Sequence, residues 1–225
     1  MTVPVIAICG IATDEASWQG MPVDAVLLPR GATIAAMADT MLPGLPTRFA
    51  LAGHSMGGYV AQEIAARLPD RLAGLALISS SAMPDSAEQQ AGRDAVIARA
   101  KDDYAGVTEG LARAMLSKSS RADPDIFALI HAMLIRCGGA TFAEQQMAVR
   151  ERIDYRPMLG AIGVPTCIIA GSEDRIIPSL RSEELAESIS GATLTLIEQC
   201  GHVPQCEAPA LTAAALSAWR TRLGD

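Results

Sequence analysis

Six short apolar segments alternate with stretches of helical periodicity along this chain of 225 residues. The apolar segments cover residues 3–9, 24–28, 49–52, 72–78, 166–170 and 193–197. Helical patterns occupy residues 33–41, 57–68, 180–189 and 210–223. The apolar segments are mostly apolar on both faces, as expected of buried parallel strands. Because parallel strands need long crossover connections, the alternation predicts one parallel sheet flanked by helices.

The alternation is interrupted once, between residues 84 and 165, where no segment has a convincing strand pattern. This stretch has its best helical patterns at residues 95–104, 107–116, 124–136 and 142–152. It is too long to be a plain loop. We therefore expect a single domain over residues 1–225, with residues 84–165 forming a helical lid inserted between the fourth and fifth strands.

Composition and charge exclude several classes of protein. Half of the residues are hydrophobic and only 4% are aromatic, so the core is expected to be aliphatic, as in covered parallel sheets. The formal net charge of −7 argues against nucleic acid as a partner. The absence of an apolar run of about 18 residues argues against a membrane span. The amino terminus lacks the basic and long apolar regions of a secretory leader.

Cysteine and histidine usage bears on redox state and metals. The five cysteines are scattered without a Cys-x-x-Cys pair, and the chain has only three histidines. An odd, widely spaced set of cysteines is a poor disulfide framework, and a zinc site needs denser ligands. We therefore expect reduced thiols in a cytoplasmic protein without a metal. Cys9 ends the first strand, where an inert buried thiol is the preferred interpretation and a reactive thiol the alternative.

The third apolar segment runs into Gly53-His54-Ser55-Met56-Gly57, which fits Gly-x-Ser-x-Gly between a strand and a helix. This is the setting of a nucleophile elbow, a tight and strained turn that projects a serine hydroxyl above the sheet. The glycines avoid collisions with neighbouring backbone. The helix amino terminus supplies unpaired N–H groups where an oxyanion would form. Ser55 is therefore the candidate nucleophile, and a glycine-rich turn with an inert serine is the alternative.

A serine nucleophile needs a base at neutral pH, and three histidines are available. His54 precedes Ser55, so its side chain should point away from the hydroxyl. His131 lies within an apolar helical pattern, which is typical of a structural residue. His202 follows the last strand and can reach the carboxyl edge of the sheet. We therefore take His202 as the candidate base.

The base needs an acid that holds its tautomer. Asp174 lies on the loop after the fifth strand, and the adjacent Glu173 is its rival. The loop after the preceding strand offers no carboxylate before Asp85, which strengthens Asp174. The chain order Ser, Asp, His is that of the α/β-hydrolase triad and differs from the chymotrypsin and subtilisin orders.

From end to end the chain resembles the α/β-hydrolase fold superfamily, in particular its small single-domain esterase-like serine hydrolases with a helical lid. The segments that carry the resemblance are GHSMGG, GSEDRIIP and CGHVPQCEAP. The resemblance implies about six parallel strands flanked by helices, without the first two family strands, and no cofactor. It also implies an oxyanion hole built from the backbone N–H groups of Ile11 and Met56. Here the oxyanion loop reads Cys9-Gly10-Ile11, where the family commonly has His-Gly-x.

Residues next to the motifs are candidates for lining a substrate pocket, namely Trp18, Met83, Ile176 and Val203, together with Ile11 and Met56. Four apolar residues of the lid are expected to be core rather than pocket, namely Met115, Phe127, Met133 and Leu134. The lid also carries arginines that a substrate carboxylate would attract. For any one of them a solvated helix face is the preferred interpretation. They are Arg93, Arg113, Arg121, Arg136, Arg150 and Arg152.

The constellation predicts a serine hydrolase that cleaves a small carboxylic ester or thioester through an acyl-enzyme. Relatives of this type also catalyse C–C bond hydrolysis, lyase reactions and cofactor-free perhydrolysis, and lid contacts decide among these reactions. A ligand-binding or signalling module with slow turnover is a third hypothesis. A nicotinamide-binding Rossmann protein is rejected, because no Gly-x-Gly-x-x-Gly follows the first strand.

Overall fold

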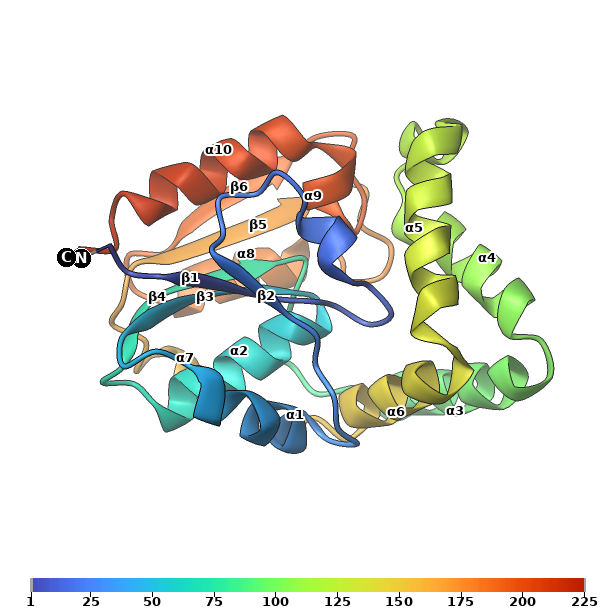
Figure 1. The fold of residues 1–225 in the computed structure, drawn as a ribbon, viewed down its shortest axis with the longest axis horizontal. Helices are drawn as coiled ribbons and strands as arrows, with labels where there is room; N and C mark the ends of the chain where they lie inside the picture. Colours follow the sequence, from blue (N-terminus) through green and yellow to red (C-terminus); the bar gives the residue numbers. More distant parts are fainter. Residues whose placement is uncertain (1, 225) are drawn as a thin grey trace.

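One parallel sheet runs through the molecule (Figure 1). The computed structural model describes residues 2–224. Within that range six strands pair in the order β2-β1-β3-β4-β5-β6, and every neighbouring pair is parallel. The strands are β1 (Val5–Ile8), β2 (Ala25–Leu27), β3 (Phe49–His54), β4 (Leu72–Ile78), β5 (Thr166–Gly171) and β6 (Thr193–Ile197). The prediction of a six-stranded parallel sheet is confirmed.

Helices cover both faces of the sheet (Figure 1). The helices on one face are α1 (Ile34–Met41), α2 (Met56–Arg67) and α8 (Leu180–Ser188), whose apolar residues share a core with Ile8, Leu51 and Leu75. The opposite face is covered by α10 (Pro209–Arg220) and the 3₁₀ helix η1 (Glu15–Trp18), which pack on Val5, Ala50 and Cys167. The short helix α9 (Pro204–Glu207) precedes α10, and a further 3₁₀ turn, η2 (Leu42–Gly44), follows α1.

The last strand departs from the expectation that every strand is buried on both faces. Leu194 and Leu196 in β6 are each 39% exposed, whereas β3, β4 and β5 are buried throughout. β6 lies at one edge of the sheet and β2 lies at the other. An edge strand has a neighbour on one side only, so an apolar sequence there does not guarantee burial.

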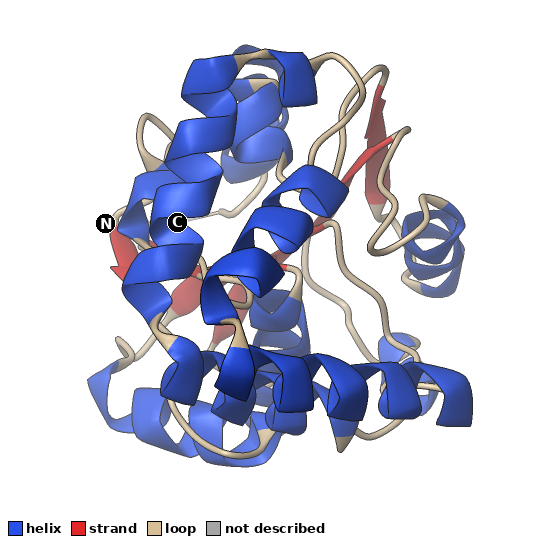
Figure 2. Ribbon diagram, turned by 90° about the vertical axis from the view of Figure 1, so that its right-hand side faces the viewer, coloured by secondary structure: helices blue, strands red, loops and turns tan. Residues whose placement is uncertain are grey.

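The chain between β4 and β5 is helical. Its α-helices within residues 2–224 are α3 (Ala87–Asp102), α4 (Tyr104–Met115), α5 (Pro124–Cys137), α6 (Gly139–Arg150) and α7 (Arg156–Leu159), with a 3₁₀ turn η3 (Ser120–Ala122) before α5. α3 and α6 lie side by side, and α4 and α5 stand at a steep angle to them (Figures 1 and 2). α3 begins eight residues before the predicted helix at residue 95. Its buried residues amount to Ala100 alone, so its first turns carry no apolar stripe, and a capping box of Ser86 and Gln89 starts it instead.

The helices α3 to α6 have an apolar core of their own. Val107, Ile130 and Phe142 are buried in it, together with Ala12 and Val203 from the sheet body. α7 behaves differently, because Leu159 packs into the core beneath the sheet. The segment after β4 therefore leaves the sheet, forms a separate layer over its carboxyl edge, and returns to the sheet at α7.

Within residues 2–224 no single helix has both the length and the apolar composition of a membrane span, and the consecutive helices α5 and α6, which together have both, are bent by 92°. No group of three or more His, Cys, Asp and Glu residues in that range could hold a metal ion. The cysteines there are all free thiols.

The first turn of α2 lies directly against the carboxyl end of β1. A Cβ atom added to Gly57 would lie 2.2 Å from the carbonyl oxygen of Ile8 and 2.8 Å from that of Cys9. Gly53, at the end of β3, is as closely packed, since its Cβ would lie 2.4 Å from the carbonyl oxygen of Gly57. Both neighbours are backbone atoms, which cannot rotate away. The two glycines of the motif are therefore required by packing.

This packing predicts that Gly57→Ala destabilises the protein by about 1–3 kcal/mol or more, because the methyl group must push two backbone segments apart. The measurement is the free energy of unfolding in urea. The control is Gly110→Ala in α4, where no other atom lies within 4 Å of the added methyl group. It should raise stability by about 0.5–1 kcal/mol. An unchanged stability of Gly57→Ala would contradict the close approach.

Candidate active site

Ser55 forms the turn between β3 and α2. Its backbone has φ 51° and ψ −115°, a left-handed conformation that is costly for a residue other than glycine. Neighbouring groups hold it there: the Ser55 N–H donates to the Ile78 carbonyl at 2.8 Å, and the Ser80 hydroxyl donates to the Ser55 carbonyl at 3.0 Å. The strained turn is thus tied to the end of β4.

The structure brings Ser55, His202 and Asp174 together from three different strand ends. His202 Nε2 lies 2.9 Å from Ser55 Oγ, and His202 Nδ1 lies 2.8 Å from Asp174 Oδ2. An ionised carboxylate only accepts, so Nδ1 carries the proton and Nε2 is free to accept from the serine hydroxyl. All three residues are buried, with Ser55 and Asp174 each 7% exposed.

Asp174 is held in its ionised form. Its Oδ1 atom accepts the N–H groups of Ile176 and Ile177 at 2.8 and 2.9 Å. Burial by itself opposes the charge, but the His202 ring and these donors outweigh it and lower the pKa of the carboxyl. Its rival Glu173 points elsewhere, accepting the N–H of Lys118 at 2.8 Å. Of the two carboxylates, Asp174 is the one that contacts His202.

His54 lies beneath this arrangement and was missed by sequence reasoning as a site residue. Its ring is fully buried, donates through Nε2 to the carbonyl of His202 at 2.8 Å, and makes no hydrogen bond to the Ser55 hydroxyl. Its Nδ1 atom has no hydrogen-bond partner within residues 2–224. Burial and the neighbouring His202 lower the pKa of His54 to about 3. His131 is remote from these residues, stacked on Phe127 in α5.

Ile11 and Met56, the residues implied for an oxyanion hole, both line the cavity that contains Ser55. Met56 is the first residue of α2, where backbone N–H groups have no partner one turn earlier. The loop of Ile11 is held from both sides. A Cβ on Gly10 would lie 2.7 Å from the His54 ring, and the Ala12 N–H donates to Gln145 of α6 at 2.8 Å.

The cavity in front of Ser55 has a volume of about 530 Å³. It lies between the carboxyl edge of the sheet and helices α3, α4 and α6. Met83 and Ile176, predicted at the pocket, line it, and so does Met115 of α4. The other residues of the inserted helices that were expected to be core do not line it, namely Phe127, Met133 and Leu134.

Two predicted pocket residues lie elsewhere. Trp18 is 2% exposed and packs with Cys9 and Leu216 in the core on the α10 side of the sheet, because η1 folds back over that face. Val203 is fully buried in the core of the inserted helices. Adjacency to a motif places the backbone near the site but does not set the direction of the side chain.

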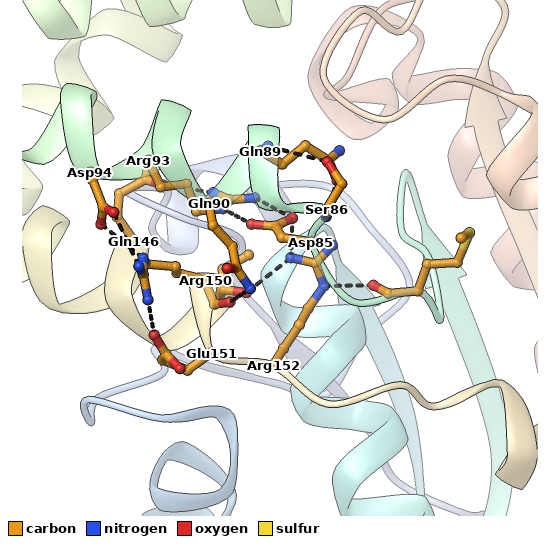
Figure 3. A network of polar contacts seen from close by, with 12 residues as sticks. Asp85, Ser86, Gln89, Gln90, Arg93, Asp94, Gln146, Arg150, Glu151 and Arg152 are labelled. Atoms are coloured by element: carbon orange, nitrogen blue, oxygen red, sulfur yellow. Dashed lines mark hydrogen bonds and ion pairs between the residues drawn. The ribbon is translucent and has the colours of Figure 1, made fainter.

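Arg93 and Arg152 were expected on solvated helix faces, but both line the cavity. They meet at Asp85, a carboxylate whose side chain is fully buried (Figure 3). No local sequence pattern predicts this cluster, since Arg152 and Asp85 are 67 residues apart.

A further missed residue is Glu207 in α9. Its carboxylate accepts the N–H groups of Ser117, Gly201 and Val203 at 2.8, 3.1 and 3.2 Å. The His202 N–H donates to the Met115 carbonyl at 2.7 Å. The loop of His202 is therefore fastened to the end of α4.

Cys9 lies on the α10 side of the sheet. Burial, with the nearby acidic residues Glu15 and Asp14, raises the pKa of its thiol to about 12. The thiol is therefore protonated at neutral pH, in keeping with the interpretation of an inert buried cysteine.

Residues 12–215 match the family model described as "Alpha/beta hydrolase family", and the matched range contains Ser55, Asp174 and His202. The pimeloyl-[acyl-carrier protein] methyl ester esterase of Neisseria meningitidis serogroup C is 32% identical over 203 residues, covering 84% of this chain and 78% of the relative.

Solved structures share the same architecture. A thermophilic esterase from Thermogutta terrifontis, with malate bound, has a TM-score of 0.89 at 28% identity and covers all of this chain and 92% of its own. The enol-lactonase from Burkholderia xenovorans LB400 has a TM-score of 0.84 at 23% identity, covering 98% of this chain and 92% of its own. At the latter identity the likeness shows the fold alone.

The buried, neutral His54 predicts a pH dependence of stability. Between about pH 6.5 and 3 the unfolded chain binds a proton at His54 that the folded protein does not bind. Stability contributed by the neutral ring is complete above about pH 6.5 and is lost as the pH falls. We expect a slope approaching about 1.4 kcal/mol per pH unit between pH 6 and 4.5 from this residue.

Urea unfolding at several pH values measures that slope. His54→Gln should flatten it whatever its effect on stability at pH 7, because the titrating group is gone. The matched control, His131→Gln, should keep the slope of the unmodified protein. A slope that survives in His54→Gln would show that His54 does not titrate in this way.

Proposed function

The chain belongs to the alpha/beta hydrolase family, and on this premise we propose that it cleaves a small carboxylic ester or thioester through Ser55, His202 and Asp174. The observation that carries the proposal is the hydrogen-bonded series from Ser55 Oγ through the His202 ring to Asp174, at the wall of a cavity of about 530 Å³. A cavity of this size suits a small molecule. That the protein is an esterase-type hydrolase rests on the family and its relatives.

In the proposed acylation step, Ser55 Oγ attacks the carbonyl carbon of the ester while His202 Nε2 takes the hydroxyl proton. Asp174 remains ionised and stabilises the imidazolium. The carbonyl oxygen becomes an oxyanion, which accepts hydrogen bonds from the N–H groups of Ile11 and Met56. Collapse of this intermediate breaks the bond to the leaving group, and His202 gives its proton to the departing alcohol or thiol.

Deacylation repeats the cycle with water. His202 takes a proton from a water molecule that attacks the acyl carbon, and the second intermediate collapses to release the acid. The proton on Nε2 then returns to Ser55 Oγ. The proposed steps use the substrate, water, the side chains of Ser55, His202 and Asp174, and the backbone N–H groups of Ile11 and Met56.

We propose that residues 84–165 form the lid of this single domain. Val96, Leu111 and Gln146, from α3, α4 and α6, are among the residues that line the cavity. Hydrogen bonds to the Glu207 carboxylate and to the Met115 carbonyl join the end of α4 to the loop of His202. We therefore propose that the inserted helices select the substrate through the side chains that they place in the cavity wall.

The second candidate substrate is a methyl ester on a longer acyl chain, which is favoured by the similarity to the pimeloyl-[acyl-carrier protein] methyl ester esterase of Neisseria. C–C bond hydrolysis, a lyase reaction and perhydrolysis use the same residues and are separated by experiment. An unresponsive panel of esters, together with stoichiometric labelling of Ser55 by a fluorophosphonate, would favour one of those reactions. A ligand that raises thermal stability and is recovered unchanged would favour a slow-turnover binding module.

The proposed roles predict that Ser55→Ala lowers kcat/KM for a chromogenic short-chain ester by roughly 10³-fold or more, because the nucleophile is lost. Asp174→Asn should cost a similar factor through the wrong histidine tautomer. Glu173→Gln is the matched control next in sequence and should keep the activity of the unmodified protein. Equal rates for the unmodified protein and Ser55→Ala would refute the assignment.

A further inference from the structure

A buried cluster of charged groups forms one wall of the cavity (Figure 3). The fully buried carboxylate of Asp85 pairs with Arg93 Nε and, at 2.6 Å, with Arg152 Nη1. Arg93 also donates through Nη1 to Gln146 at 2.6 Å, and its side chain is 23% exposed. Its Nη2 atom has only a long contact with Asp85, at 3.5 Å. The Arg93 guanidinium therefore retains donor capacity on the cavity side.

The cluster is fixed close to the nucleophile. Arg152 donates through Nε to the carbonyl of Met83 at 2.8 Å, and its guanidinium lies 4.5 Å from the ring centroid of Tyr59. Tyr59 follows Ser55 by four residues, which is about one helical turn, or ~5.4 Å along α2. Tyr59, Arg93 and Arg152 all line the same cavity as Ser55. A group bound by the cluster would share a cavity of about 530 Å³ with an ester carbonyl at Ser55, and the size of this cavity limits their separation to a few carbon atoms.

The charges on the cavity wall do not balance. Four arginines line the cavity, namely Arg93, Arg152, Arg175 and Arg181, and Asp85 is the one carboxylate among the described lining residues. Arg181 pairs with Glu184 at 2.7 Å. Asp85 neutralises one of its two arginine partners, and Arg175 has no ion pair within residues 2–224. Two positive charges are left facing the cavity of a chain whose formal charge is −7.

A purely structural ion pair would not need this surplus. One arginine neutralises the charge of one carboxylate, and a second cation beside it adds repulsion and desolvation cost unless an anion joins the cluster. Arginine also suits carboxylates because its planar fork can donate two parallel hydrogen bonds.

We propose that this wall is an anion subsite, and that the preferred substrates are esters that carry a carboxylate a few carbon atoms from the scissile carbonyl. This inference rests on the proposed function for its choice of substrate, but the subsite itself is a separate claim. The carboxylate can lie on the acyl or on the alcohol side of the ester. Its hydrogen bonds come from Arg93, with Arg152 and Arg175 adding charge.

The kinetic test compares monomethyl glutarate with its neutral amide of equal length, methyl glutaramate. We expect the unmodified protein to prefer the anionic ester by about tenfold or more in kcat/KM, since hydrogen bonds between charged groups are the stronger ones. Arg93→Gln should lower that ratio about tenfold. Arg113→Gln, a lid arginine outside the cavity, is the matched control and should keep the ratio. 4-Acetoxybutyrate and its neutral amide are compared in the same way, as a second pair in which the carboxylate lies on the alcohol side of the ester.

Arg175→Gln is the second variant, because Arg175 is exposed and its replacement should not disturb folding. We expect about a threefold fall in the ratio. Two results would show that the subsite is wrong while the proposed function stands. In the first, the unmodified protein cleaves the esters without preference for the anionic one in either pair. In the second, Arg93→Gln and Arg175→Gln have the same ratio of kcat/KM values as the unmodified protein.

A binding measurement separates the two claims when no ester is cleaved. Calorimetric titration of Ser55→Ala with glutarate should give a Kd that rises about tenfold when Arg93→Gln is added. Loss of affinity in that double variant without any esterase activity in the unmodified protein would support the subsite and refute the proposed function. Equal affinity in the single and double variants would overturn the subsite.

Discussion

At Ser55 the chain leaves β3 and enters α2 through a single residue of positive φ. Such a conformation costs about 1–3 kcal/mol for a residue with a side chain, so it persists only where its surroundings hold it. The hydrogen bonds to Ile78 and from Ser80 supply that support from β4. Ala12, in the loop after β1, and Ser79, directly after β4, also have positive φ. Backbone strain therefore gathers at the carboxyl edge of the sheet, where the cavity opens.

Ser55, Asp174 and His202 could be predicted as neighbours because each follows a strand that the sequence indicates clearly. Parallel strands bring their carboxyl ends to one edge, so Ser55, Asp174 and His202 could be assigned to one place without knowing any long-range contact. The choice of Asp174 over Glu173 depends on finer detail. The N–H groups of the following loop fold back onto the Asp174 carboxylate, whereas Glu173 turns toward Lys118.

The parts that sequence reasoning missed depend on the direction of side chains and on contacts across the chain. Trp18 and Val203 are close to the site in sequence, but each packs into a different core. Arg152 was expected in solvent because a charged residue near a helix end normally is exposed, and only the folded chain brings it to Asp85. The number of strands follows from the apolar runs, whereas their order in the sheet was not predicted. The lining of a cavity under inserted helices does not follow from them either, because it is decided by how those helices pack.

The positive charge at the cavity wall is opposite in sign to the net charge of the whole protein. The distance to each group of charges decides which of them dominates the interaction with an anionic ligand. Charges on the outer surface act through water, and at physiological ionic strength they are screened beyond about 8 Å. A carboxylate about 4 Å from a guanidinium at a partly buried wall gains up to about 4 kcal/mol at an effective dielectric constant of 20. The local arginines therefore outweigh the net charge of −7 once the ligand is inside. Asp174 adds to the asymmetry, because its negative charge behind His202 repels an anionic group from the Ser55 end of the cavity. Under the proposed function and subsite, a substrate with one ester and one carboxylate would be oriented with the ester at Ser55.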